Sequence, residues 1–540
     1  MNGQTLLRNF DVLVEAPGGI DRLRDLIYQL ALRGRLVAQD PEDEPVTELL
    51  ARLDRERTSI ESAGIFRLAK KGPNVTILPF QPPEGWKWLR LGDIAHPQPG
   101  FAFKSRGFNT VGAGMPLVRI RDIGVGRTEC FFDGEYRSEF VIANGDYLVG
   151  MDGNFNIRRW SGDAALLNQR VTRLVFFGSE LMKPFVAWAL QSAINELQGT
   201  KAYTTVQHLA GKQIASAPIC LPPIAEQRRI VAKVDELMGL CDELERRHRR
   251  RSQTGRESLA SVLAALDSSE SVEEVKSAWN RLDSCMSELV SRPGDVSQLR
   301  ECVWRLATRG LLVRQDSGEA PAGDFLDKVH AMRDGRKTYG AVVVKEVSRR
   351  FAELPALPQG WLWAQFGDVA VNRDSERVPL RREDRELRRE PYDYYGASGV
   401  IDKIDDYLFE GPHLLIGEDG ANLVSRSTPI AFLADGRFWV NNHAHVLASV
   451  DRDALDYLAI FVNSIDLKPL LTGTAQPKLN QARLNKIPVP VPPHSEQKRI
   501  VHRVRELLDL CDRLEEVLSG REGTARKFAV SATSSLILAT

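Results

Sequence analysis

The chain has 540 residues, of which 43% are hydrophobic and 27% charged, a composition typical of a folded protein with three or four domains. Its 72 basic and 72 acidic side chains cancel, so the net charge does not support nucleic-acid binding, although a neutral chain can still carry a basic face. It has no run of about 18 apolar residues and no basic start before an apolar core, so we expect neither a membrane span nor a secretory signal.

The predicted elements divide the chain into five regions. Short alternating runs bounded by Gly, Asn and Asp are typical of strands, and they gather in two blocks that each also contain a helix. In chain order we expect an N-terminal helical region at 1–75, a first α/β block at 76–222, a central helical region at 223–350 that opens with a heptad helix at 224–250, a second α/β block at 351–492, and a C-terminal heptad helix at 493–540.

Three segments of the first half return in the second half. "LRDLIYQLALRGRLVAQD" at Leu23 returns as "LRECVWRLATRGLLVRQD" at Leu299, a shift of 276 residues. "PPEGWKWLRLGDIA" at Pro82 returns as "LPQGWLWAQFGDVA" at Leu357, a shift of 275. "PPIAEQRRIVAKVDELMGLCDELE" at Pro222 returns 270 residues later as "PPHSEQKRIVHRVRELLDLCDRLE". These matches in one order indicate a duplication and an approximate two-fold axis, which suits a nearly two-fold partner such as duplex DNA.

Each heptad helix carries an apolar series with alternating spacings of four and three, which is typical of a coiled-coil seam. We expect the two seams to pack on each other as an antiparallel pair, the alternative being that each helix packs on its own domain. About 25 residues of helix span about 37 Å, close to one turn of B-DNA at about 34–36 Å. The seam residues are Ile230, Val234, Leu237, Cys241 and Leu244 in the first helix and Ile500, Val504, Leu507, Cys511 and Leu514 in the second.

The two blocks between these helices share little sequence, which predicts one scaffold with two different readers. Residues 85–222 hold 15 basic and 11 acidic side chains, a balance of +4, whereas residues 358–492 hold 15 and 19, a balance of −4. The basic concentration between Arg377 and Arg389 is interspersed with acidic residues, a pattern equally typical of a self-paired, solvated helix face. Bulk charge therefore favours DNA contact by the first block only.

Several predicted turns are rich in Arg, Asn and Gln, side chains that read base edges, although Asn and Gly also favour ordinary polar loops. These turns lie at 100–109, 153–159, 168–170 and 201–208 in the first block and at 394–399, 420–426, 441–445 and 472–483 in the second. The candidate DNA-binding residues are Lys104, Arg106, Asn154, Asn156, Arg158, Arg159, Gln169, Arg170, Tyr203 and Gln207 in the first block, and Ser398, Asn422, Arg426, Asn442, His443, Gln476 and Lys478 in the second.

Signatures of catalysis and of metal binding are missing from the sequence. We find no P-loop for nucleoside triphosphates and no methyltransferase or nuclease motif, and "NNHAH" lacks further metal ligands nearby. Six scattered cysteines without a CxxC pair predict reduced thiols in a cytoplasmic protein. We therefore expect no catalytic residue, metal or cofactor in this chain.

Taken with their order, these motifs resemble the specificity subunits of type I restriction-modification systems. The most specific parts are the twin "PP..EQ.RIV" helices, the "GWKWLRLGDIA" and "GWLWAQFGDVA" openings, "GFAFKS" at Gly100, "LNQRVTRL" at Leu167 and "YYGASGVIDKIDDYLFEG" at Tyr394. The resemblance covers nearly the whole chain. It implies two α/β target-recognition domains joined by long antiparallel coiled-coil helices, each domain reading one half of a bipartite, asymmetric site in double-stranded DNA.

The same resemblance implies partners. Two methylation subunits would bind S-adenosylmethionine and methylate adenine, motor-nuclease restriction subunits would join them in some complexes, and this chain would carry neither activity. Two hypotheses from other classes stay open at this point: a two-fold coiled-coil adaptor for protein partners, and an enzyme with an unrecognised site in the blocks. Loops rich in Arg, Asn, Gln and Tyr favour DNA reading, because an adaptor would more often display an apolar patch.

Overall fold

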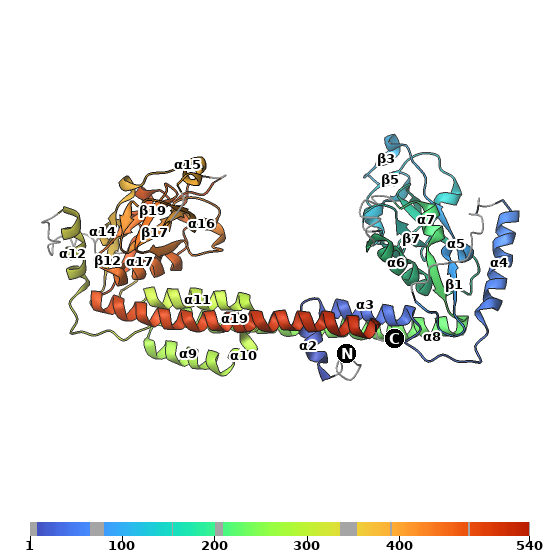
Figure 1. Ribbon diagram of the computed structural model, residues 1–540, viewed down its shortest axis with the longest axis horizontal. Helices are drawn as coiled ribbons and strands as arrows, with labels where there is room; N and C mark the ends of the chain where they lie inside the picture. The colour runs from blue at the N-terminus through green and yellow to red at the C-terminus, as the bar shows by residue number, and fades with distance from the viewer. Residues whose placement is uncertain are drawn as a thin grey trace. The chain divides into compact units, whose positions relative to one another are not determined.

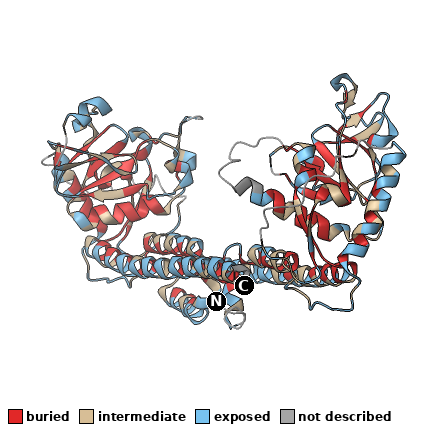
Figure 2. Ribbon diagram, turned by 45° about the vertical axis from the view of Figure 1, so that its right-hand side comes forward, coloured by how far each residue is buried: buried red, intermediate tan, exposed pale blue. Residues whose placement is uncertain are grey.

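The computed structural model describes residues 8–64, 68, 80–153, 155–199, 209–334, 354–388, 391–473 and 476–538. Unit 1 consists of Met1–His248 with Thr524–Thr540, and unit 2 of Arg249–Gly523. In both units the sheets are largely buried, and the helices that cover them are buried on one side and exposed on the other (Figure 2). None of the helices in the described part of the chain is both long and apolar enough to cross a membrane.

Unit 1 is organised around a four-stranded antiparallel sheet in the order β2-β10-β7-β8. Helix α6 packs its apolar side, including Phe185 and Leu190, into the same core as Val149 and Leu174 of that sheet (Figure 1). The elements are α2 (Phe10–Glu15), α3 (Gly19–Leu32), α4 (Val46–Ser62), β1 (Lys87–Arg90), α5 (Leu91–Ile94), β2 (Ala95–Pro99), β3 (Phe108–Asn109), β4 (Met115–Val118), β5 (Phe131–Phe132), β6 (Val141–Ile142), β7 (Tyr147–Gly150), β8 (Ile157–Arg159), β9 (Ala165–Leu167), β10 (Val171–Phe176), α6 (Lys183–Gly199), α7 (Gly211–Ser216) and β11 (Pro218–Leu221).

Unit 2 has a corresponding four-stranded antiparallel sheet in the order β13-β20-β17-β18, packed against α17 (Figure 1). Its elements are α9 (Val272–Ser284), α10 (Met286–Leu289), α11 (Pro293–Thr308), α12 (Ala322–Asp334), β12 (Leu362–Gln365), α14 (Phe366–Val369), β13 (Val371–Asn372), α15 (Arg382–Glu386), β14 (Tyr392–Gly396), β15 (Gly399–Ile404), β16 (Phe409–Glu410), β17 (His413–Gly417), α16 (Asn422–Ser425), β18 (Ala431–Ala434), β19 (Arg437–Val440), β20 (Ala444–Ala448), α17 (Arg452–Ser464), α18 (Gln481–Leu484) and β21 (Pro488–Val491).

The internal repeat extends into the blocks, where the sequence shows almost no match. In each unit the sheet strands occupy equivalent places in the order, a long helix follows, and an outer two-stranded pair (β1 with β11, β12 with β21) closes the block. The units differ in a second sheet, which has the order β3-β5-β4-β9-β6 in unit 1 and β15-β14-β19-β16 in unit 2. The two units therefore share one sheet and differ in the other. This arrangement agrees with the predicted common scaffold that carries two different blocks.

The two heptad helices are longer than their sequence signal. Helix α8 spans Ile224–Asp267 and α19 spans His494–Leu538. Helix α8 therefore does not end near residue 250, because Leu259, Leu263 and Leu266 enter a buried cluster with Cys511 and Leu518 of α19. That burial offsets the cost of a polar stretch with a glycine in the helix interior, which is about 1 kcal/mol for the glycine.

Most of the predicted seam residues pack within their own block, and Cys511 and Leu514 pack with the other long helix as expected. In unit 1 they join the core that also contains α3 and the sheet, and in unit 2 they divide between the core under α17 and the cluster with the later part of α8. The opening heptads of both helices are covered by their own blocks, and residues 259–266 of α8 meet residues 511–518 of α19. The predicted seam residues of α8 are Ile230, Val234, Leu237, Cys241 and Leu244, and those of α19 are Ile500, Val504, Leu507, Cys511 and Leu514.

The repeated "GW" and "PP..EQ" motifs hold each long helix to its block. In unit 1 the indole nitrogen of Trp86 donates to Oε2 of Glu226 at 2.9 Å, and Gln227 Nε2 donates to the carbonyl of Pro222. In unit 2 the indole nitrogen of Trp361 donates to Oε2 of Glu496 at 3.0 Å. Burial raises the pKa of both glutamates, although the indole bonds oppose this.

Candidate nucleic-acid interface

In unit 1, three of the four predicted reader turns lie together. The amide of Gly100 donates to the carbonyl of Val171, and Phe101 forms a parallel bridge with Asn168. Gly100 is required there, because a Cβ atom would lie 2.1 Å from the carbonyl oxygen of Asn168. The amide of Met151 donates to the carbonyl of Arg170, which brings the start of the 153–159 turn to the same place.

The candidate side chains on these turns are exposed, apart from those outside the described residues. Nη1 of Arg170 lies 2.9 Å from Oδ2 of Asp152, so an ion pair within the unit partly neutralises the charge of this arginine. Arg158 and Arg159 lie on the edge strand β8, where neighbouring residues point to opposite faces of the sheet. Exposed are Lys104, Arg106, Asn156, Arg158, Arg159, Gln169 and Arg170, whereas Asn154, Tyr203 and Gln207 lie outside the described residues.

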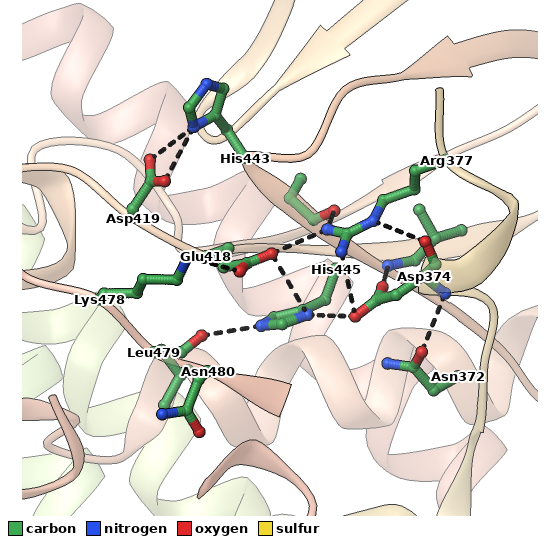
Figure 3. Close-up of polar contacts among 12 residues, drawn as sticks. Asn372, Asp374, Arg377, Glu418, Asp419, His443, His445, Lys478, Leu479 and Asn480 are labelled. Atoms are coloured by element: carbon green, nitrogen blue, oxygen red, sulfur yellow. Dashed lines mark hydrogen bonds and ion pairs between the residues drawn. The ribbon is translucent and has the colours of Figure 1, made fainter. Parts of the chain in front are cut away.

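In unit 2, backbone hydrogen bonds join all four predicted reader turns, and Figure 3 shows the part around Asp419, His443 and Lys478, where β17 ends and β20 begins. The amide of Glu418 donates to the carbonyl of His443, and that of Leu479 donates to the carbonyl of Glu418. The amide of Gly420 donates to the carbonyl of Pro477. The amide of Asn441 donates to the carbonyl of Tyr395, which joins the 394–399 turn to the others.

Below these turns is a buried polar network centred on His445, which is 1% exposed. Its Nε2 lies 2.8 Å from the carbonyl oxygen of Leu479, and its Nδ1 lies 2.6 Å from Oδ2 of Asp374. Burial opposes ionisation of Asp374, but the contacts with His445 and two further hydrogen bonds hold the pKa of this carboxyl below its usual value. A carbonyl and a carboxylate only accept hydrogen bonds, so both ring nitrogens of His445 face acceptors.

Arg377 and Lys478 complete the network. Arg377 lies 2.9 Å from Glu418 and 3.6 Å from Asp374, and Lys478 lies 3.1 Å from Glu418. Burial raises the pKa of Glu418, but the contacts with these cations lower it by more, so the pKa of this carboxyl lies below its usual value. Lys478, a predicted DNA contact, is thus partly engaged inside the unit.

Two predicted DNA contacts in unit 2 have internal roles. The guanidinium of Arg426 donates to the carbonyls of Asn463 and Ile465 at the end of α17, so it closes that helix. The side chain of Asn422 bonds to the backbone of Thr428 in both directions. Asn422 has the ordinary turn role that the sequence left open as the alternative, whereas the helix-capping role of Arg426 was not considered. The exposed candidates that remain are Ser398, Asn442, His443 and Gln476, besides Lys478.

The arginines that follow β13 are largely ion-paired within unit 2, and most of these pairs reach acidic residues outside the run instead of following one helix face as the alternative interpretation held. Arg385 lies 2.9 Å from Asp402, and Arg388 lies 2.9 Å from Asp405. Arg382 pairs with Glu386 one helical turn away. These pairs leave unit 2 with little unbalanced positive charge for phosphates.

A family model, the type I restriction modification DNA specificity domain, matches residues 83–251 and again 358–519. The chain belongs to this family. It is 24% identical over 96% of its length to the EcoEI specificity subunit of Escherichia coli, of which 94% is covered, and equally similar to the EcoAI specificity subunit. A further alignment, to the EcoBI specificity subunit of E. coli, covers 34% of this chain and 38% of that protein, and the sequence identity within it is 34%.

The fold agrees with this membership. A structure solved in work on complex assembly of the type I R-M system matches 85% of this chain and 99% of its own, with a TM-score of 0.50 at 16% identity. The predicted fold class of a specificity subunit is confirmed: two units with α/β domains, and long helices. Within the described residues, no group of three or more potential metal ligands is placed to hold an ion.

The sequence prediction missed an aromatic cluster beside the unit 1 turns. Phe101 is 43% exposed, its ring meets Phe103 edge-on at 5.1 Å, and the guanidinium of Arg137 lies 5.7 Å from its centre. The repeated phenylalanines of "GFAFKS" were visible, but only the fold shows which ring is exposed. An exposed, fixed aromatic ring next to polar reader turns offers a surface on which a base can stack.

The cysteines take no part in this surface. All six are free, and five are buried. Burial raises the pKa of Cys220 and of Cys302 to about 12, so both thiols stay protonated at neutral pH. They act as small apolar side chains in the cores.

Proposed function

We propose that this chain is the sequence-specific DNA-recognition subunit of a type I restriction-modification complex and that it reads a bipartite, asymmetric site. The observation that carries this proposal is the convergence of polar turns at the ends of strands in each unit, with different side chains on a shared frame. Gly100 and Asn168 in unit 1 and Glu418 and His443 in unit 2 mark the two places. Equal frames with unlike readers fit a target whose halves differ in sequence.

The partners follow from the family. We infer that the chain docks two methylation subunits, which bring S-adenosylmethionine, and that motor-nuclease subunits join where the system restricts DNA. The chain itself would supply recognition without catalysis or a bound cofactor. We also infer that the chain acts in the cytoplasm, because the DNA that it would bind lies there. The adaptor hypothesis has no supporting observation, since the turns that converge present mainly polar groups.

The direct test is methylation mapping in a host that carries the chain with its methylation subunits. We expect one motif made of two short, different sequences separated by a spacer of fixed length and unread sequence. Single-molecule sequencing of genomic DNA would detect the modified adenines. A continuous motif, or modification that follows no motif, would contradict the proposal.

A further inference from the structure

Among the converging turns of unit 2, the side chain of His443 is held in one orientation, and this orientation limits which groups it can bind. Nδ1 of His443 lies 2.8 and 3.0 Å from the two carboxylate oxygens of Asp419. The side chain of His443 is 48% exposed, whereas that of Asp419 is 15% exposed. The second ring nitrogen of His443 is turned away from Asp419, and it has no hydrogen-bond partner among the described residues (Figure 3).

The backbone beneath this pair is held from several sides. The carbonyl of His443 accepts from the amide of Glu418, and its amide donates to Oδ1 of Asn441. Asp419 forms an antiparallel bridge with Lys478. The imidazole ring of His445, two residues further on, contacts the carbonyl of Leu479 and the carboxylate of Asp374 below the surface. His443 is therefore fixed by a buried frame, which a base-reading side chain needs.

The contact with Asp419 fixes the tautomer of the neutral His443 ring. A carboxylate oxygen only accepts hydrogen bonds, so the Nδ1 that lies against Asp419 carries the proton and donates it. In this tautomer Nε2 carries no proton and presents a lone pair to solvent.

An outward lone pair excludes phosphate and selects a donor. Phosphate oxygens only accept hydrogen bonds, whereas the exocyclic amino groups of adenine and cytosine donate them at the floor of the major groove. The neighbouring cations Arg377 and Lys478 are engaged with Glu418, so they do not turn the place into a phosphate site.

We propose that His443 is a specificity-determining residue of unit 2, which accepts a hydrogen bond from a base amino group through Nε2, and that Asp419 and His445 are positioning residues. This inference depends on the proposed function, since it names one contact of the half-site read by unit 2. It identifies the reader as a hydrogen-bond acceptor in a unit whose charge balance does not favour DNA.

The test uses the complete complex with its methylation subunits and duplexes that carry the mapped target. Each base of the unit 2 half-site is replaced in turn by an analogue that lacks the exocyclic amino group, and binding of wild type and His443→Ala is compared. At one position we expect the analogue to weaken wild-type binding about tenfold or more, as for loss of a base contact, and to leave the binding of His443→Ala unchanged. The half-site of unit 1 stays intact in both proteins.

Asp419→Asn tests the positioning role in a chain that keeps His443. We expect both ring tautomers to be populated, and the analogue effect to shrink but not vanish. Asp435→Asn is the control, because Asp435 is also an ion-paired aspartate but lies beside the other end of β17, where Ala434 pairs with His413. It should bind like wild type.

Three results would overturn the inference. The first is an analogue effect of equal size in wild type and His443→Ala at every position. The second is a His443→Ala protein that loses affinity for all sequences alike with a smaller salt dependence, which identifies a phosphate contact. The third is an Asp419→Asn protein indistinguishable from wild type. Failure of the proposed function looks different, because the wild-type complex would then show no bipartite motif at all.

Discussion

The twin tryptophan–glutamate contacts give a prediction in which one half of the chain serves as the control for the other. Trp86→Phe and Trp361→Phe each remove an indole donor from a buried glutamate and leave a similar cavity, because the two tryptophans are 6% and 8% exposed. Oε1 of Glu226 has no partner among the described atoms, so the first variant leaves this carboxyl without a hydrogen bond. Oε1 of Glu496 still accepts from Gln315 at 3.3 Å in the second.

The expected difference follows from that remaining bond. A buried polar group without a partner costs about 1–3 kcal/mol, and one retained bond is worth about 1 kcal/mol, so Trp86→Phe should be the more destabilising by about 1 kcal/mol. The measurement is hydrogen exchange in the second turn of each long helix, at residues 230–234 and 500–504. We expect exchange to rise about fivefold more in the first variant than in the second. Equal effects, or a larger effect of Trp361→Phe, would refute the reasoning.

The pH dependence of the same variants is fixed in sign. Burial raises the pKa of Glu226 above that of the unfolded chain, so the folded protein favours the protonated carboxyl. The buried carboxylate lowers the free energy of unfolding by its full amount above the pKa of Glu226 in the folded protein. This effect vanishes below the pKa of the same group in the unfolded chain. The penalty of Trp86→Phe should therefore shrink as the pH is lowered through this range, and a penalty that grows on acidification would contradict the assignment.

Three further predictions separate readers from structural residues. Joint replacement of Arg158 and Arg159 by alanine should weaken or re-specify one half-site in methylation mapping, and equal damage to both halves would contradict reading by separate domains. Gly100→Ala should disturb the same half-site, because its Cβ atom would lie 2.1 Å from the carbonyl of Asn168; unchanged methylation there would show that the turn is free to move. Arg426→Ala should lower the thermal unfolding temperature by a few degrees without changing the motif, since its guanidinium binds backbone carbonyls, and a changed motif with normal stability would return it to the readers.

The sequence by itself determined the duplication and the scaffold. The matched seams, the paired "GW" and "PP..EQ" motifs and the positions of the polar turns were all local patterns, and local patterns survive in the order of residues. They led to the family, to the two α/β domains and to the long helices. Bulk charge also indicated that the second block, with its balance of −4, would not depend on cations in the way that the first can.

Only the tertiary structure decided which polar residues are free to read DNA. Arg426 and His443 stand in turns of similar composition, yet one closes α17 and the other is exposed above Asp419. The likeness of the two sheets was equally hidden, because strands of one order can be built from many apolar sequences that fit the same core. The length of α8 past residue 250 depended on α19, whose Cys511 and Leu518 supply the surface that Leu259 and Leu263 bury. Contacts between residues far apart in the chain made each of these decisions, and no local pattern records them.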